Sequence, residues 1–188
     1  MKKTIALAVI LCLAGCAQQR PWVKTERLYT NQSQGFSVEL PDNWMRSSKA
    51  DFLVATRDGF PLQSIYIRKL NIKENPLKNT KKTLQKGMLP QEVAEIVLDD
   101  TISASSLTDV RTEEDVPMPI AGIPGFRLVY TFRNKSGLKM KAILCGALID
   151  DSLLVARYGA PQRYYFDMDA TTFEKVLRSL KVTDGTKR

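Results

Sequence analysis

The sequence predicts an α+β domain in which a mostly antiparallel β-sheet carries helices on both faces. Strand-like segments occupy the early and late parts of the chain, around one long helical segment, and a second helix follows them. One late segment, residues 142–149, is apolar at every position, as expected for a central strand covered on both sides. The 188 residues, 44% hydrophobic and 26% charged, fit one globular domain and exclude a disordered or collagen-like chain.

Three strands are predicted in the first half of the chain, at residues 35–40, 52–56 and 64–70. In the first of them, Phe36, Val38 and Leu40 alternate with polar residues, which is the pattern of a half-buried strand. Asp58 and Gly59 form a turn signal between the second and third strands.

The long middle helix begins at Pro90, because proline suits the first helical position. Glu92 and Glu95 place negative charge near the helix N-terminus, where the helix dipole favours it. An apolar stripe that includes Val93 and Val97 predicts that one face of this helix is buried.

Three further strands are predicted at residues 126–133, 139–149 and 153–158, the last two forming a hairpin about Asp150 and Asp151. In the first of these strands, the expected buried residues are Phe126, Leu128, Tyr130 and Phe132, and the expected outward residues are Arg127, Thr131 and Arg133. A final helix is expected near residues 171–180, where Thr171 to Glu174 match a capping box.

The N-terminus has the pattern of a bacterial export signal. Two lysines precede an apolar run at residues 5–14, which is too short to span a bilayer. The run ends in Leu-Ala-Gly-Cys and resembles the lipobox of bacterial lipoproteins, with Cys16 as the acylated residue. Ala17 in place of aspartate favours the periplasmic face of the outer membrane over the inner membrane.

The predicted organisation is therefore a signal peptide over residues 1–15, a lipidated N-terminus and tether over 16–34, one domain over 35–183 and a tail over 184–188. Two long acyl chains on one cysteine would hold such a domain on a membrane, since each buried methylene contributes about 0.8 kcal/mol.

Two short motifs resemble the PsbP-like superfamily. Residues 35–41 (GFSVELP) followed by Trp44 are similar to its opening motif, and residues 122–128 (GIPGFRL) fall in the order that its members show. The resemblance covers about residues 28–182 and implies an α/β/α sandwich. It also implies a protein-binding or assisting role without shared catalytic residues, because the superfamily includes extrinsic photosystem subunits, a Ran-binding import factor, effector chaperones and DcrB-like lipoproteins. The lipobox favours the DcrB-like branch.

No constellation in the sequence predicts catalysis or a cofactor. Histidine is absent, which removes the commonest general base and metal ligand. Cys145 lies in the apolar run and is expected to be a buried hydrophobic residue. Ser136 and Lys139 match a Ser-x-x-Lys pattern, but they straddle a predicted turn and not a helix start. The paired aspartates lack the spacing of a calcium loop. We expect neither an enzyme nor a metal site.

Charge is segregated along the chain, whose formal net charge is +8. Residues 92–115 carry eight acidic residues against one basic residue, whereas residues 68–86 carry seven basic residues against one acidic residue. We name these seven the basic segment: Arg68, Lys69, Lys73, Lys78, Lys81, Lys82 and Lys86. Either it is a solvated loop or it contacts anionic head groups or an acidic partner. Nucleic acid is not an expected ligand, because no aromatic residues interleave these lysines.

These features together predict a membrane-anchored, periplasm-facing lipoprotein. Its expected role is that of a non-catalytic binding or assembly module for an envelope protein partner. The alternative is a carrier that holds a lipid or a small apolar ligand between the sheet and the helices. Such a carrier requires an apolar cavity of about several hundred Å³.

Overall fold

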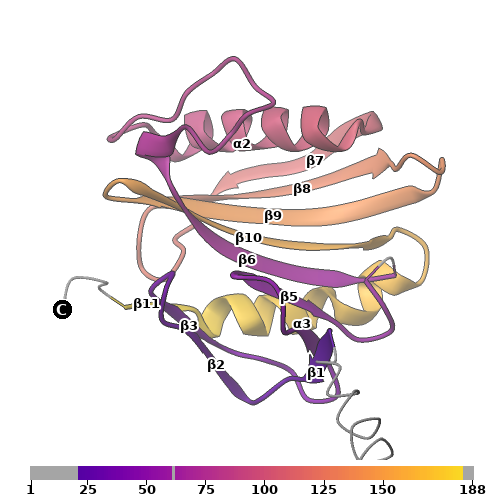
Figure 1. Ribbon diagram of the computed structural model, residues 1–188. Coiled ribbons are helices and arrows are strands. Elements are labelled where there is room, and N and C mark those ends of the chain that lie inside the picture. The colour runs from indigo at the N-terminus through magenta and orange to yellow at the C-terminus, as the bar shows by residue number, and fades with distance from the viewer. Residues whose placement is uncertain (1–20, 61, 184–188) are drawn as a thin grey trace, which may run out of the picture.

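An antiparallel sheet lies between two helices in the computed structural model, which describes residues 21–60 and 62–183 (Figure 1). Helix α2 (Pro90–Ser105) covers one face and helix α3 (Tyr165–Ser179) covers the other. The predicted fold class, an α+β domain with helices on both faces of a mostly antiparallel sheet, is confirmed. Residues 1–20 and 184–188, with the predicted signal peptide, Cys16 and the tail, lie outside the described residues.

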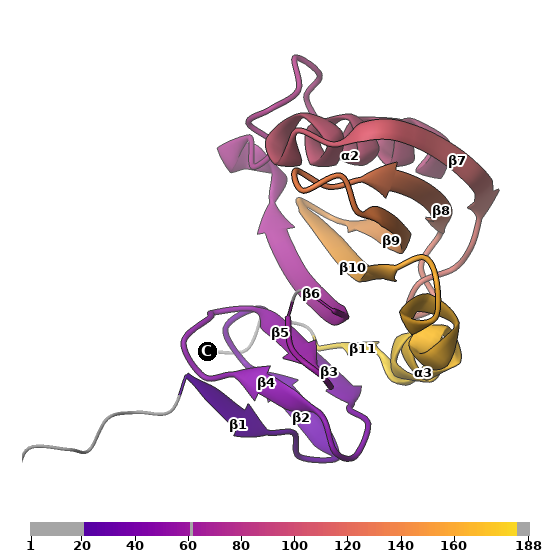
Figure 2. The ribbon, with the colours of Figure 1, turned by 90° about the vertical axis from the view of Figure 1, so that its right-hand side faces the viewer.

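Eight strands of the described residues form the main sheet. In spatial order they are β1 (Trp22–Lys24), β4 (Met45–Ser47), β5 (Leu53–Thr56), β6 (Ser64–Asn71), β10 (Ser152–Pro161), β9 (Lys139–Ile149), β8 (Gly125–Arg133) and β7 (Thr108–Pro117). A smaller sheet contains β11 (Lys181–Val182), β3 (Phe36–Glu39) and β2 (Leu28–Asn31), and a 3-10 helix η1 (Ile72–Glu74) follows β6. Figure 2 shows the curvature of the main sheet around α2.

The two faces of the main sheet carry separate hydrophobic cores. Strand β9 shows this division, because Ile143 and Cys145 enter the core on the α3 side and Ala142 and Leu144 enter the core on the α2 side. Alternate side chains of a strand point to opposite faces, so a strand buried on both faces must be apolar throughout. The predicted central, doubly covered strand is confirmed.

Helix α3 begins six residues before the predicted start, so the predicted capping box at Thr171 is wrong. The N-cap position is Tyr164, and Thr171 is an exposed residue inside the helix. The physical reason is the burial of Phe166, which lies seven residues before Phe173 and enters the same core. The hydroxyl of Tyr158 donates to the carbonyl oxygen of Phe166 at 3.1 Å, which fixes the first turn of the helix to β10.

Arg133 is exposed as predicted, but the rest of the β8 face that was expected to point outward is covered. Val129 and Thr131 are buried, and Arg127 is largely buried between two carboxylates, Glu114 at 2.5 Å and Glu174 at 3.0 Å. The alternation along β8 is real, but its polar side faces α3 instead of solvent.

The segment predicted as a tether to residue 34 is folded from residue 22 onward. Strand β1 pairs with β4, and β2 pairs with β3. Tyr29 packs on the α3-side core, and the side-chain amide of Asn31 donates to the carbonyl oxygen of Asp51 at 2.8 Å. The domain therefore includes these strands, whose short length and mixed exposure hide them from periodicity.

Candidate functional site

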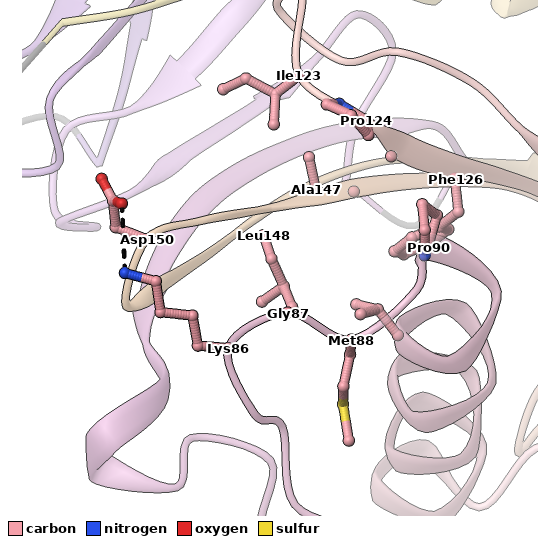
Figure 3. Close-up of a pocket in the computed structure, with 13 residues that line it drawn as sticks. Lys86, Gly87, Met88, Pro90, Ile123, Pro124, Phe126, Ala147, Leu148 and Asp150 are labelled. Atoms are coloured by element: carbon pink, nitrogen blue, oxygen red, sulfur yellow. Dashed lines mark ion pairs between the residues drawn. The ribbon is translucent and has the colours of Figure 1, made fainter.

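An apolar cavity of about 280 Å³ lies where the segment before α2 meets the ends of β8 and β9 (Figure 3). Met88, Val93, Phe126 and Leu148 contribute its walls. At its rim, the Lys86 ammonium lies 3.8 Å from the Asp150 carboxylate, and both side chains are exposed. A cavity of this kind can hold an apolar group but offers no charged group in its interior.

Two glycines allow β8 and β9 to approach closely beside this cavity. A Cβ atom on Gly125 would lie 2.4 Å from the carbonyl oxygen of Gly146. A Cβ atom on Gly146 would lie 2.8 Å from the ring of Phe126. The preceding turn is closed by two backbone hydrogen bonds between Ile120 and Ile123, at 2.8 and 2.9 Å. The motif at residues 122–128 therefore shapes one wall of the cavity.

The basic segment does not form a single cluster. Arg68 lines a groove against α2, and Lys69 follows it on β6, where side chains alternate between the faces. Lys73 belongs to η1, and the remaining members are exposed on the connection between η1 and α2: Lys78, Lys81, Lys82 and Lys86. The buried side chains of Leu77 and Leu84 fasten this connection to the α2-side core.

Acidic residues that are distant in sequence compensate much of this basic charge. Lys73 pairs with Asp151 at 2.6 Å, Lys82 pairs with Glu95 of α2, and Lys86 pairs with Asp150. In both views the basic connection lies at the top, beyond α2, whereas β1 lies at the bottom (Figures 1 and 2). A contact of this segment with a membrane or an acidic partner stays a prediction.

Reversing the charge at Lys78, Lys81, Lys82 and Lys86 should leave the melting temperature nearly unchanged, because exposed ion pairs contribute only about 0–1 kcal/mol each. If the segment is a contact, the variant should lose binding to anionic vesicles that the wild type shows at low salt. The matched control reverses four other exposed lysines: Lys135, Lys139, Lys175 and Lys181. An equal loss of vesicle binding in both variants would show that net charge causes the effect. The basic segment would then be a solvated loop.

The opposite end of β9 carries a partly exposed apolar surface, in which Leu138 and Tyr164 are exposed and Pro161 is buried. We name it the terminal apolar surface and define it by five residues: Leu62, Leu138, Pro161, Tyr164 and Tyr165. Four of them line a shallow hollow of about 760 Å³, and the ring of Tyr164 packs edge-on against Tyr165 at 5.2 Å. It lies at the end of the sheet that faces the viewer in Figure 2. Lys139 and Arg163 are the charged residues that line the hollow.

Tyr164 occupies a strained backbone conformation on this surface. Its φ of 75° and ψ of −61°, with the hydrogen bond from the Tyr165 amide to the Arg163 carbonyl at 3.0 Å, define a classic γ-turn. The side chain is 68% exposed, so burial does not compensate this strain. Strain of about 1–3 kcal/mol at an exposed residue is a recurrent property of binding sites.

A partly buried polar network connects the segment that contains Leu62 to helix α3. The Asp169 carboxylate on α3 accepts hydrogen bonds from Arg57 at 3.2 Å and from the Gln63 side-chain amide at 3.1 Å. Arg57 and Gln63 also donate to Asp58, and these hydrogen bonds, that of Arg57 foremost, hold the pKa of the Asp58 carboxyl below its usual value. The network fixes the β5–β6 connection, which contributes Leu62, to the first turns of α3.

Comparison with solved structures identifies the fold. Cyanobacterial PsbP (CyanoP) from Synechocystis sp. PCC 6803 superposes with a TM-score of 0.58 and 14% identity, over 91% of this chain and 99% of that chain. The Ran-binding protein Mog1p of Saccharomyces cerevisiae has a TM-score of 0.58 and 12% identity, over 86% and 97%. LpqN of Mycobacterium tuberculosis, described as involved in cell envelope biogenesis, has a TM-score of 0.52 and 13% identity, over 88% and 87%.

The protein has a PsbP-like fold. At these identities the likeness shows the fold, and it does not single out the DcrB-like branch, which stays a prediction. No family model and no curated protein matches the sequence.

The catalytic candidates of the PsbP-like domain have structural roles. The Ser136 hydroxyl donates to the Asn134 side chain at 2.8 Å inside the β8–β9 turn. Cys145 is fully buried, and burial raises the pKa of its thiol to about 12. Within residues 21–60 and 62–183, no group of His, Cys, Asp and Glu side chains is placed to hold a metal ion. No helix in that part of the chain is long and apolar enough to cross a membrane.

The Cys145 thiol of the folded PsbP-like domain should resist alkylation by iodoacetamide at about pH 8, because only the thiolate reacts. The same thiol should react fully after unfolding in guanidinium chloride. Mass spectrometry of the intact protein measures both reactions, and a Cys145→Ser variant identifies the labelled position. Rapid labelling of the native protein would contradict the burial of this strand.

Proposed function

We propose that this protein is a lipid-anchored, non-catalytic binding module of the bacterial cell envelope. It is attached through Cys16, faces the periplasm at the outer membrane, and binds an envelope protein through the terminal apolar surface. The observation that carries the proposal is Tyr164, a large, exposed side chain held in a strained turn among other apolar residues. Aromatic residues of this kind dominate the binding energy of protein interfaces.

The chemistry of the surface defines the partner. Its apolar centre is lined by Lys139 and Arg163, so the complementary surface is an apolar side chain flanked by carboxylates. The structural neighbours support this class of function, because Mog1p is described as Ran-binding and LpqN as involved in cell envelope biogenesis. Attachment to the envelope rests on the lipobox of the sequence.

Photo-cross-linking in living cells tests the binding surface. A benzoylphenylalanine residue at position 138 should give a discrete cross-linked protein, and the same residue at Leu89, an exposed apolar position before α2, should not. Adding Tyr164→Gly should abolish the cross-link from position 138. It should leave the fold intact or stabilise it by about 1 kcal/mol, because glycine adopts a positive φ without strain. Equal cross-linking from both positions, or a cross-link that survives Tyr164→Gly, would refute the proposed surface.

Metabolic labelling with palmitate tests the anchor. Cys16→Ala should abolish labelling and leave uncleaved precursor, because the thiol that forms the thioether is missing. Cys145→Ser should label like the wild type, because Cys145 is buried inside the domain. Persistent labelling of Cys16→Ala would show that the lipoprotein prediction is wrong.

The apolar cavity beside α2 favours one second function, that of a carrier for a small apolar ligand. Its volume of about 280 Å³ and its apolar walls match that role. Organic extraction of the purified protein should then release a ligand. Met88→Trp should reduce the amount of ligand recovered, because the indole fills the cavity. Leu89→Trp is the matched control, since Leu89 is exposed beside it. Equal yields from both variants would exclude this cavity as the carrier site.

A further inference from the structure

A second cavity lies between the C-terminal half of α2 and the strands β6 and β10. We name it the arginine groove. Its volume is about 250 Å³, and two guanidinium groups, those of Arg68 on β6 and Arg157 on β10, belong to its lining. The sheet-facing wall also includes the apolar side chains of Leu70, Leu144 and Val155. The groove thus combines a concentrated positive charge with apolar walls.

Neither guanidinium forms an ion pair with a carboxylate of the described residues. No ion pair joins Arg68 or Arg157 to an acidic side chain among residues 21–60 and 62–183, although eleven other ion pairs form there. The Nε atom of Arg68 is buried, and it has no hydrogen-bond partner in the described part of the chain. Arg157 donates from Nε to the Tyr130 hydroxyl at 3.0 Å. Buried donors are nearly always paired, so the orphaned Nε requires an explanation.

The other polar groups of the groove are compatible with an anionic ligand. Tyr66 lines the groove, and burial raises the pKa of its hydroxyl to about 12, so that it remains a hydrogen-bond donor at neutral pH. Asp100 on α2 is the one acidic residue of the lining. Its Oδ1 atom already accepts hydrogen bonds from the backbone amide and the side-chain amide of Asn79, at 2.7 and 3.2 Å.

We propose that the arginine groove binds a small oxyanion, a carboxylate or a phosphate, that carries an apolar body. The oxyanion lies against the guanidinium groups of Arg68 and Arg157, since guanidinium groups match carboxylates and phosphates in geometry. The apolar body lies against Leu70, Leu144 and Val155. This site is separate from the terminal apolar surface, and neither proposal depends on the other.

Isothermal titration calorimetry of the full chain in a non-ionic detergent tests the groove. It measures the affinity for three probes: 3-phenylpropionate, phenyl phosphate and the neutral 3-phenylpropionamide. At least one of the two anions should bind about tenfold more tightly than the amide, because charge-assisted hydrogen bonds are the strong ones. The ratio of the dissociation constants of the two anions distinguishes a carboxylate site from a phosphate site.

Two substitutions assign the binding to the groove. Arg68→Met should weaken anion binding at least about tenfold while the melting temperature is retained or raised, because the substitution removes a buried donor that has no partner. Lys69→Gln is the matched control: it removes one positive charge from the next residue of β6, on the opposite face, and should bind like the wild type. Amide binding as tight as anion binding, or equal anion affinity in Arg68→Met and the wild type, would overturn the proposal.

Discussion

Gly125→Ala is expected to destabilise the domain by roughly 3 kcal/mol, the upper part of the range for an overpacked core. The added Cβ atom would lie 2.4 Å from the backbone oxygen of Gly146 and 3.0 Å from that of Met118. Backbone atoms of a central sheet cannot move aside as a flexible side chain can, so β8 and β9 must separate. Urea-induced unfolding, followed by circular dichroism, measures the change.

A glycine in an open position provides the control for this substitution. Gly137 in the β8–β9 turn has a φ of 78°, and a Cβ atom added there would meet nothing within 4 Å. Gly137→Ala should therefore cost only about 1 kcal/mol, from the left-handed backbone alone. Equal costs at the two positions would show that β8 and β9 are not as close as described.

Asp169→Ala is expected to cost about 2 kcal/mol, because it removes a buried charged acceptor and leaves the Arg57 and Gln63 side chains with Asp58 alone. The Asp169 side chain is 4% exposed, whereas that of Arg57 is 27% exposed and keeps its ion pair with Asp58, so the expected cost lies below the range for fully buried pairs. The substitution removes one of the two acceptors of the Gln63 side-chain amide. In urea-induced unfolding, the Asp169→Ala variant should reach its midpoint at a lower denaturant concentration than the wild type.

Asp167→Ala is the matched substitution, since Asp167 is exposed two residues earlier on the same helix. It should change stability by less than about 0.5 kcal/mol, as surface substitutions usually do. If both variants unfold at the same denaturant concentration, the network does not fasten the β5–β6 connection to α3.

Strands with a strong apolar pattern could be predicted from the sequence, and strands defined by their neighbours could not. The apolar run of β9 and the alternating pattern of β8 correctly predicted these two strands. Strand β7 escaped prediction because most of its residues are polar and exposed, and its extended form follows from pairing with β8. The short strands β4 and β11 likewise depend on partners that are distant in sequence.

The start of α3 shows how a local signal can mislead. Thr171 to Glu174 satisfy the sequence pattern of a capping box, yet the buried Phe166 extends the helix by almost two turns toward the N-terminus. Tertiary packing of one aromatic residue outweighs a cap, whose contribution is only about 1 kcal/mol.

The candidate binding sites were mostly hidden in the sequence. Leu62 and Leu138 belong to two separate connections and Tyr165 begins α3, and only the fold brings them to one surface. The signal that was present is the Tyr164–Tyr165 pair between a strand and a helix. The basic segment was visible as a charge pattern, but its alternation along β6 separates Arg68 from Lys69, and acidic residues distant in sequence pair with three of its lysines.

The two outer strands of the main sheet limit how any partner can be recognised. Strand β7 has two register shifts against β8, is rich in exposed acidic residues and ends in Pro117. Strand β1 has three residues. A regular, uncharged edge can accept an added strand from another polypeptide, whereas short, charged or irregular edges resist it. Under the proposed function, recognition would therefore use side chains and pockets and not strand addition to the main sheet, and copies of the domain would not polymerise through the edges of this sheet.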